Sequence, residues 1–212
     1  MKHIQCLLLL FISHLAFSQT KSFLPVEISI GGNQLLSNDE ITPKNGINLS
    51  VLKISRLDKR INILTGLSFA SIRYYDAYIN CGHFCYYKDM NVSMYELSIP
   101  IFVRLNTGNK YKFFFESGPS LEIVPIKSGK GIEVSSLPTS VSSTEKDVTI
   151  NLDHETIDLG LTIGLGCIVP IYEQSLVLSL VYHNSYKSFN NTTTMLSEYF
   201  SFSLGIIFNT SD

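Results

Sequence analysis

The amino-acid sequence predicts an all-β fold, an eight-stranded antiparallel up-and-down transmembrane β-barrel. Eight segments of the 212-residue chain alternate large apolar residues with small or polar ones at a period of two, as half-buried strands do. Short and long connections alternate between these segments. After residue 18 no long uninterrupted apolar stretch appears, so a chain that enters a membrane has to cross it with strands that close on themselves.

The charge of the chain excludes one broad class of function. The formal net charge is −2, and no run of basic residues is present, so the sequence carries no electrostatic footprint for nucleic acid. Charged residues make up 16% of the chain, below the roughly 25% of soluble domains. The charged fraction is therefore lower than that of a typical soluble domain.

The first residues have the pattern of a secretory signal peptide. A short basic start at Lys2 and His3 precedes the apolar stretch from Ile4 to Phe17, which ends in a small-x-small cleavage site. A permanent helical anchor is the weaker reading, because the strongly apolar run is short. We therefore predict that residues 1–18 are cleaved and that residues 19–212 form one barrel domain.

The predicted strands run, in chain order, over residues 25–31, 46–57, 61–74, 92–105, 111–124, 156–169, 175–184 and 199–209. Several approach the ~9–11 residues that a strand needs to cross a bilayer obliquely. The closing segment alternates most plainly, with Phe200, Phe202, Leu204, Ile206 and Phe208 on one face. In the second segment the alternation slips at Val51 and Leu52, which predicts a β-bulge there.

The connections between the strands predict which end of the barrel faces which side. Short turns are expected at residues 58–60, 106–110 and 172–174, and long loops at residues 32–45, 76–91, 125–155 and 185–196. Short periplasmic turns and long extracellular loops are typical of outer-membrane barrels. With eight strands, both termini lie on the periplasmic side.

The two faces of the strands differ in a way that favours lipid outside the barrel. In a soluble ligand-binding barrel the large apolar face would point inward. Here the opposite face carries residues such as Gly66, Ser68, Gly164 and Ser203, which would cover a soluble surface poorly but fit a cramped interior. Tyr111, Tyr182 and Tyr199 lie near strand ends, where we expect them to form aromatic girdles at the membrane interfaces.

Two adjacent strands carry a resemblance to a known family. The segment MYELSIPIFVRL at Met94–Leu105 resembles a Tyr-Leu-Glu-Ile-Pro strand of the PorT-like outer-membrane β-barrel family, small barrels of the OmpA/OmpX type. The next strand, FFFESGPSLEI at Phe113–Ile123, is similar to that family's Gly-Gly-Pro strand, and Asp158, Gly160, Gly164 and Gly166 match a later one. The resemblance implies an outer-membrane barrel in a family named after a protein-secretion component.

These observations lead to a functional hypothesis. We expect a non-enzymatic outer-membrane protein with a structural or interaction role through its extracellular loops, inserted by the barrel-assembly machinery and without a cofactor. Its partners would be outer-membrane lipid and an envelope protein. An accessory subunit of a protein-secretion or envelope-assembly system is the main alternative. A lipid A-modifying enzyme, a small-solute channel and a soluble ligand-binding barrel are further alternatives.

Two cysteines lie close together in the second long loop. Cys81 and Cys85 flank the residues Gly-His-Phe, and the oxidising space that such a loop faces favours a disulfide between them. A metal site formed by Cys81, His83 and Cys85 is the alternative, although it lacks a fourth ligand and a recognised spacing.

Several charged residues share the inward face of the predicted strands. They are Glu27, Glu96, Arg104, Lys112, Glu116 and Asp158. Because buried charges need partners, we expect carboxylate–arginine and carboxylate–lysine pairs that fill the interior. The alternative, a gate in a narrow channel, is disfavoured because side chains fill the interior of an eight-stranded barrel.

One short stretch invites an enzymatic interpretation. His183 and Ser185 with a later Glu198 imitate the order of residues in lipid A deacylase barrels. The first two share the inward face, whereas Glu198 shares the outward face of Phe200. Since a nucleophile, its base and the residue that orients the base must lie within hydrogen-bond reach, the alternation argues against an active site.

Overall fold

The computed structural model describes residues 24–36, 41–82, 85–136, 143–151, 156–186 and 198–208, and every regular element in these ranges is a β-strand. These same ranges contain no helix with the length and apolarity that a membrane crossing requires. The predicted signal peptide, residues 1–18, lies outside the described residues.

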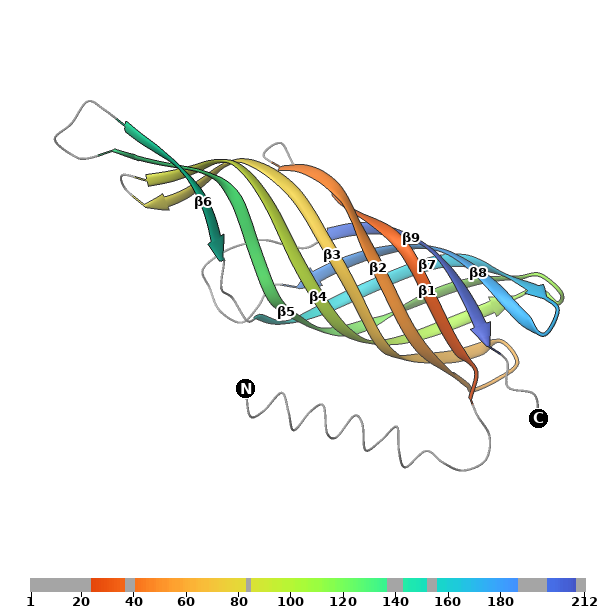
Figure 1. Cartoon of the computed structure of the whole chain (residues 1–212). Coiled ribbons are helices and arrows are strands. Elements are labelled where there is room, and N and C mark those ends of the chain that lie inside the picture. Colours follow the sequence, from red (N-terminus) through yellow and green to blue (C-terminus); the bar gives the residue numbers. More distant parts are fainter. Residues whose placement is uncertain are drawn as a thin grey trace.

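The strands are β1 (Val26–Leu35), β2 (Ile41–Arg56), β3 (Ile61–Gly82), β4 (Cys85–Thr107), β5 (Lys112–Ser136), β6 (Ser143–Asn151), β7 (Thr156–Ile171), β8 (Gln174–Tyr186) and β9 (Glu198–Phe208). Eight of them form a closed ring in the order β4-β3-β2-β1-β9-β8-β7-β5, because β4 also pairs with β5 (Figure 1). All pairings are antiparallel, and the first and last strands meet with Val26 opposite Phe208. The predicted ring of eight antiparallel strands is therefore confirmed.

One strand was not expected. β6 pairs with β5 from Ser128 opposite Asn151 to Ser136 opposite Ser143 and takes no place in the ring. The distal parts of β3, β4 and β5 continue beyond the ring and carry β6 on their side, at the end opposite the short turns (Figure 1). We call residues 76–82, 85–91, 128–136 and 143–151 together the outer extension.

The outer extension corrects the prediction of long loops. Residues 76–82 and 85–91 form a paired hairpin that continues to Gly82 opposite Cys85, and the described residues between 125 and 155 belong to β5 or β6. The connection at 32–45 is likewise shorter than predicted, because β1 extends to Leu35 and β2 begins at Ile41. The alternation of apolar and polar residues is weak in these segments. Only the backbone pairing in the structure identifies them as strands.

The predicted bulge at Val51 and Leu52 is wrong. The register of β2 with both neighbours runs without a break there, and Val51 is exposed while Leu52 is buried. The pattern slips because large apolar residues occupy both faces, not because a residue is inserted. The register shift of β2 lies instead between Lys44 and Ile47.

The outer face of the ring is apolar, as predicted. Along β9, Phe200, Phe202, Leu204, Ile206 and Phe208 are 38–60% exposed, whereas the residues between them are buried. The other ring strands add exposed apolar side chains of the same kind, including Ile28, Ile30, Leu49, Val51, Leu67, Phe69, Leu97, Ile101, Val103, Phe113, Phe115, Leu159, Ile163, Leu165 and Leu180. An apolar belt of this extent is a surface for lipid rather than for water.

Two apolar clusters fill the inside of the ring near its two ends. The first, near the short turns, contains Leu52, Ile54, Leu64, Phe114, Ile168, Val177 and Ile207. The second, near the outer extension, contains Leu35, Ala70, Ile72, Tyr74, Met90, Val92, Met94 and Tyr199. The predicted girdle position of Tyr199 is therefore wrong, because this residue lies on the buried face of β9 and is only 8% exposed.

Candidate functional site

Polar side chains occupy the interior between the two apolar clusters. They come from alternate positions of the ring strands, where the pleat turns every second residue inward. Two hydrogen-bonded clusters stand out, one around Arg104 and one around His183. Because these groups are shielded from water, the contacts that each one makes decide whether its burial is tolerated.

The first cluster is an ion triad built on β4, β5 and β1. Arg104 donates from Nη1 to Glu27 Oε2 at 2.6 Å and from Nε to Glu116 Oε2 at 2.8 Å. Its Cζ atom lies 4.1 Å from the centre of the Phe114 ring. All three charged side chains are almost completely buried. The triad therefore ties β1 to β4 and β5 across the interior.

The second cluster, the His183 cluster, consists of Glu96, Ser120, Glu122, Thr162, His183, Ser185 and Tyr199. His183 Nε2 lies 3.0 Å from Glu122 Oε1, and Nδ1 lies 3.0 Å from the hydroxyl of Thr162. The ring of His183 stacks on the ring of Tyr199 with centroids 4.6 Å apart. The imidazole is therefore held on both nitrogens and on one face.

The two carboxylates of the His183 cluster differ in how well they are satisfied. Ser120 donates to Glu122 Oε1 at 2.5 Å, and Ser185 donates to Glu122 Oε2. Glu96 accepts a bond from the Tyr199 hydroxyl on Oε1 at 3.2 Å. Its other oxygen, Oε2, is buried and has no hydrogen-bond partner among the described residues. One carboxylate is thus fully bonded and the other only half.

Gly160 of β7 makes the space that this arrangement needs. A Cβ atom at this position would lie 1.7 Å from Glu122 Oε1 and 2.6 Å from both His183 Cε1 and Ser120 Oγ. No real side chain fits at such distances, so the carboxylate and the imidazole occupy the volume that any other residue would fill.

A small cavity of about 80 Å³ lies between the two clusters. Its walls include Glu27 and Glu116 from the first cluster and His183 and Tyr199 from the second. Hydroxyl and amide side chains make up much of the remainder: Ser29, Asn48, Ser50, Ser68, Ser98, Ser120, Thr162, Ser179, Ser201 and Ser203. A polar cavity of this volume has room for several water molecules.

The structure brings most of the predicted inward charges into these clusters. Glu27, Arg104 and Glu116 form the ion triad, and Glu96 belongs to the His183 cluster. Lys112 and Asp158 are half-buried, Lys112 opposite Ile168 and Asp158 opposite Glu122 in the sheet.

Sequence reasoning missed the carboxylate of Glu122. The signal was available, because Glu122 continues the inward alternation that runs from Glu116 through Gly118 and Ser120. No alternation, however, reveals that Glu122 of β5 and His183 of β8 meet. That contact depends on which strands close the ring.

The arrangement around His183 does not form a serine-protease-like triad. Ser185 Oγ and Glu122 Oε1 both approach the same nitrogen, Nε2, at 3.3 and 3.0 Å. A triad needs the nucleophile on one nitrogen and the carboxylate on the other. Ser185 moreover donates a hydrogen bond to Glu122. Glu198 lies on the other face of the sheet and accepts a bond from Asn184, as the alternation predicted.

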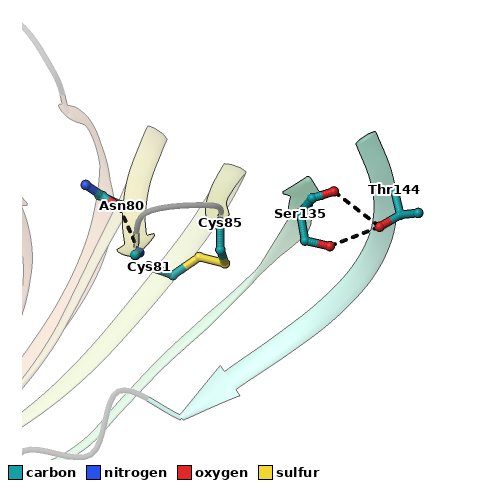
Figure 2. Close-up of a disulfide and its surroundings, with 6 residues drawn as sticks. Asn80, Cys81, Cys85, Ser135 and Thr144 are labelled. Carbon is teal, nitrogen blue, oxygen red and sulfur yellow. Dashed lines mark hydrogen bonds between the residues drawn. A yellow bond between two sulfur atoms is a disulfide. The ribbon is translucent and has the colours of Figure 1, made fainter. Parts of the chain in front are cut away.

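The two cysteines of the outer extension are bonded to each other. Cys81 is the penultimate residue of β3 and Cys85 begins β4, with their Cα atoms 5.3 Å apart, so the disulfide closes the tip of this hairpin (Figure 2). A thiolate metal site at these cysteines is incompatible with this bond, and His83 lies outside the described residues.

Further contacts tie the strands of the outer extension together. Ser135 of β5 and Thr144 of β6 share a hydrogen bond of 2.9 Å beside the disulfide (Figure 2). Lys88 of β4 donates to Glu145 of β6 at 2.6 Å, and this hydrogen bond raises the pKa of the Lys88 ammonium. The extension is therefore a cross-linked sheet rather than a set of separate loops.

A known protein family matches this chain. The family described as "Outer membrane protein beta-barrel domain" matches residues 17–194, most of the chain. No curated protein sequence matches the chain significantly.

Solved structures of outer-membrane proteins are similar to this chain at low sequence identity. Neisserial surface protein A shows the same fold; it is 13% identical over 89% of this chain and 98% of its own, with a TM-score of 0.52. Ail, the attachment invasion locus protein of Yersinia pestis, is 14% identical over 87% and 97%, with a TM-score of 0.40. A major outer membrane protein from Thermus thermophilus is 13% identical over 87% and 98%, with a TM-score of 0.46.

Proposed function

Because the chain belongs to the outer membrane protein beta-barrel domain family, we propose that it is a small, non-enzymatic barrel that acts through its outer extension. The ring sits in the outer membrane with its apolar belt in contact with lipid. The outer extension faces the outside of the cell, and the short turns face the periplasm, as in other barrels of this kind.

The filled interior supports a role other than transport. The two apolar clusters and the ion triad occupy the ring in layers along its length, and the cavity between them is only about 80 Å³. Ring closure with eight strands leaves an interior that side chains fill. A solute would have to displace buried ion pairs and packed apolar groups to pass.

The outer extension is the single observation that carries the proposal. β3, β4 and β5 contain 22, 23 and 25 residues, about twice the ~9–11 that a bilayer crossing needs. The chain keeps the additional residues as ordered sheet, with a disulfide at one tip and a ninth strand at its side. Ordering so many additional residues costs conformational entropy. We expect such a cost where the projecting surface itself has a function.

The chemistry of β6 indicates what the extension offers to a partner. Within the described residues this strand pairs only with β5, so its other edge presents backbone donors and acceptors. Exposed side chains of both charges lie along it at Glu145, Lys146 and Asp147. We propose that the partner is an envelope or surface protein that meets a polar strand edge.

Site-specific photo-crosslinking in the native cell tests this proposal. A photoreactive residue at Lys146 on β6 should give a discrete crosslinked product in intact cells, whereas the same residue at Lys59 in a short turn should give none. Crosslinks from Lys59 alone would contradict the proposal.

A secretion or envelope-assembly subunit is the second candidate. The PorT-like resemblance at Met94–Leu105 and Phe113–Ile123 favours it, and it predicts a stable partner on the periplasmic side. Crosslinks from Lys59 would support this candidate, so one experiment separates the two.

The non-enzymatic part of the proposal has its own test. Replacing the Ser185 hydroxyl in Ser185→Ala should leave the lipid A and phospholipid profile of the outer membrane unchanged by mass spectrometry. A chain that loses an acyl-cleavage product with Ser185→Ala, but keeps it with Ser179→Ala as control, would be an enzyme.

A further inference from the structure

From the His183 cluster we infer a buried site for a divalent transition-metal ion, with Zn²⁺ as its probe. The proposal stands apart from the function proposed above, because the site lies inside the ring and the outer extension takes no part in it. Its ligands would be Glu96 of β4, Glu122 of β5 and His183 of β8.

The geometry brings three metal-binding atoms together. One carboxylate oxygen each from Glu96 and Glu122 and one ring nitrogen of His183 all lie within 4.8 Å of one another. The Nε2 atom of His183 and Oε1 of Glu122 are 3.0 Å apart, close to the separation of two ligands bound to one ion at about 2.1 Å each. The Glu96 oxygen lies within 4.8 Å of both atoms, so Glu96 would move closer to them to bind the same ion.

The half-satisfied carboxylate of Glu96 points independently to a missing cation. Its side chain is 2% exposed, and Oε2 has no hydrogen-bond partner among the described residues. Two carboxyl groups meet one imidazole here, so when both are ionised even a protonated His183 leaves one negative charge uncompensated. A divalent ion bound to Oε2 would satisfy that oxygen and balance the charge.

Each ligand is also held by a second residue, as ligands of metal sites are. Thr162 lies 3.0 Å from Nδ1 of His183, so the nitrogen that would bind the ion is Nε2, which now contacts Glu122. Ser120 and Ser185 orient Glu122, and Tyr199 orients Glu96 through Oε1. Gly160 leaves the space in which these groups converge.

The mixture of ligand types decides the class of ion. Imidazole favours zinc, iron, nickel and copper ions, whereas Mg²⁺ and Ca²⁺ prefer sites made of oxygen alone. Water in the adjoining polar cavity could complete the coordination. Because β4, β5 and β8 meet only when the ring closes, the ion would bind the folded barrel and stabilise it.

Zinc content after refolding tests the inference. The mature chain is refolded into detergent micelles with ZnCl₂, passed over a desalting column and analysed by mass spectrometry for metal. We expect about one zinc ion per chain, retained in excess Mg²⁺, and a higher urea midpoint than without zinc. Glu96→Gln should lose this zinc, whereas Glu27→Gln, a buried carboxylate outside the site, should keep it.

Folding of each variant is checked by the shift in gel mobility between unboiled and boiled samples. Wild-type protein that folds but retains no zinc would overturn the inference. So would equal zinc in folded Glu96→Gln, or displacement of zinc by Mg²⁺. If Glu96→Gln fails to fold, zinc retention and the urea midpoint of the wild-type chain decide the matter.

Discussion

At the scale of single residues, the interior depends on charges that are buried together. Arg104 is 1% exposed and holds both Glu27 and Glu116, so the triad combines two negative charges with one positive charge. Breaking a buried ion pair by removing one partner is far more costly than exchanging the whole set for apolar residues. The triad is therefore a point at which one substitution has a large effect.

Replacing Arg104 tests how much this triad stabilises the barrel. Arg104→Met keeps the length of the side chain but leaves two buried carboxylates without their cation, and we expect a loss of about 3–5 kcal/mol. Urea unfolding in detergent micelles measures it, with Arg56→Met, at an exposed position, as control. Equal stability of the two variants would mean that the triad adds nothing.

Gly160 offers a second test at the residue scale. Gly160→Ala places a methyl group where Glu122 and His183 now lie, and we expect overpacking to cost about 1–3 kcal/mol. Gly32→Ala is the matched control, because its Cβ would find only one atom within 4 Å, the carbonyl oxygen of Gly46 at 3.8 Å. An unchanged urea midpoint for Gly160→Ala would contradict the described packing.

The sequence predicts much of the interior and misses its decisive contacts. Alternation identifies which side of each strand Glu96, Arg104 and Glu116 occupy, because that depends only on the pleat. It places Tyr199 wrongly because a tyrosine near a strand end suits a girdle and an interior equally. The meeting of Glu122 with His183 lies beyond any local pattern, since it depends on the registers of two strand pairs, β5 with β7 and β7 with β8.

At the scale of elements, the outer extension departs most from expectation. Polar strands such as β6 lack the apolar alternation that reveals a membrane strand, so residues 125–155 read as a loop. Pairing with β5 and the Lys88–Glu145 ion pair instead hold residues 143–151 in an ordered strand. Alternation of apolar and polar residues indicates that one face of a strand is buried. A strand exposed to water can be ordered without such burial, and its sequence then lacks the alternation.

Removing the disulfide should loosen this extension without opening the ring. In the double variant Cys81→Ser/Cys85→Ser we expect faster trypsin cleavage at Lys88 on membranes, because the tip of the hairpin loses its covalent closure. The mobility shift on boiling should stay as in wild type, because no ring contact is removed. Loss of that shift would show that the hairpin supports the barrel itself.

At the scale of the whole molecule, the apolar belt should make the ring sensitive to charge. Leu204→Arg places a cation midway along the outer face of β9, where a bilayer should impose a cost of about 2–4 kcal/mol. Leu57→Arg, at an exposed position in the β2–β3 turn, should cost about 0–1 kcal/mol. Unfolding from lipid vesicles measures both, and equal costs would contradict a lipid-facing belt.

The most direct test of the account is fractionation of cells that produce the protein, combined with its mobility in detergent gels. We expect it in the outer membrane, migrating faster before boiling than after, because a closed ring pairs its backbone throughout and resists detergent until heated. A soluble protein with no mobility shift would contradict the lipid-facing assignment of the apolar belt.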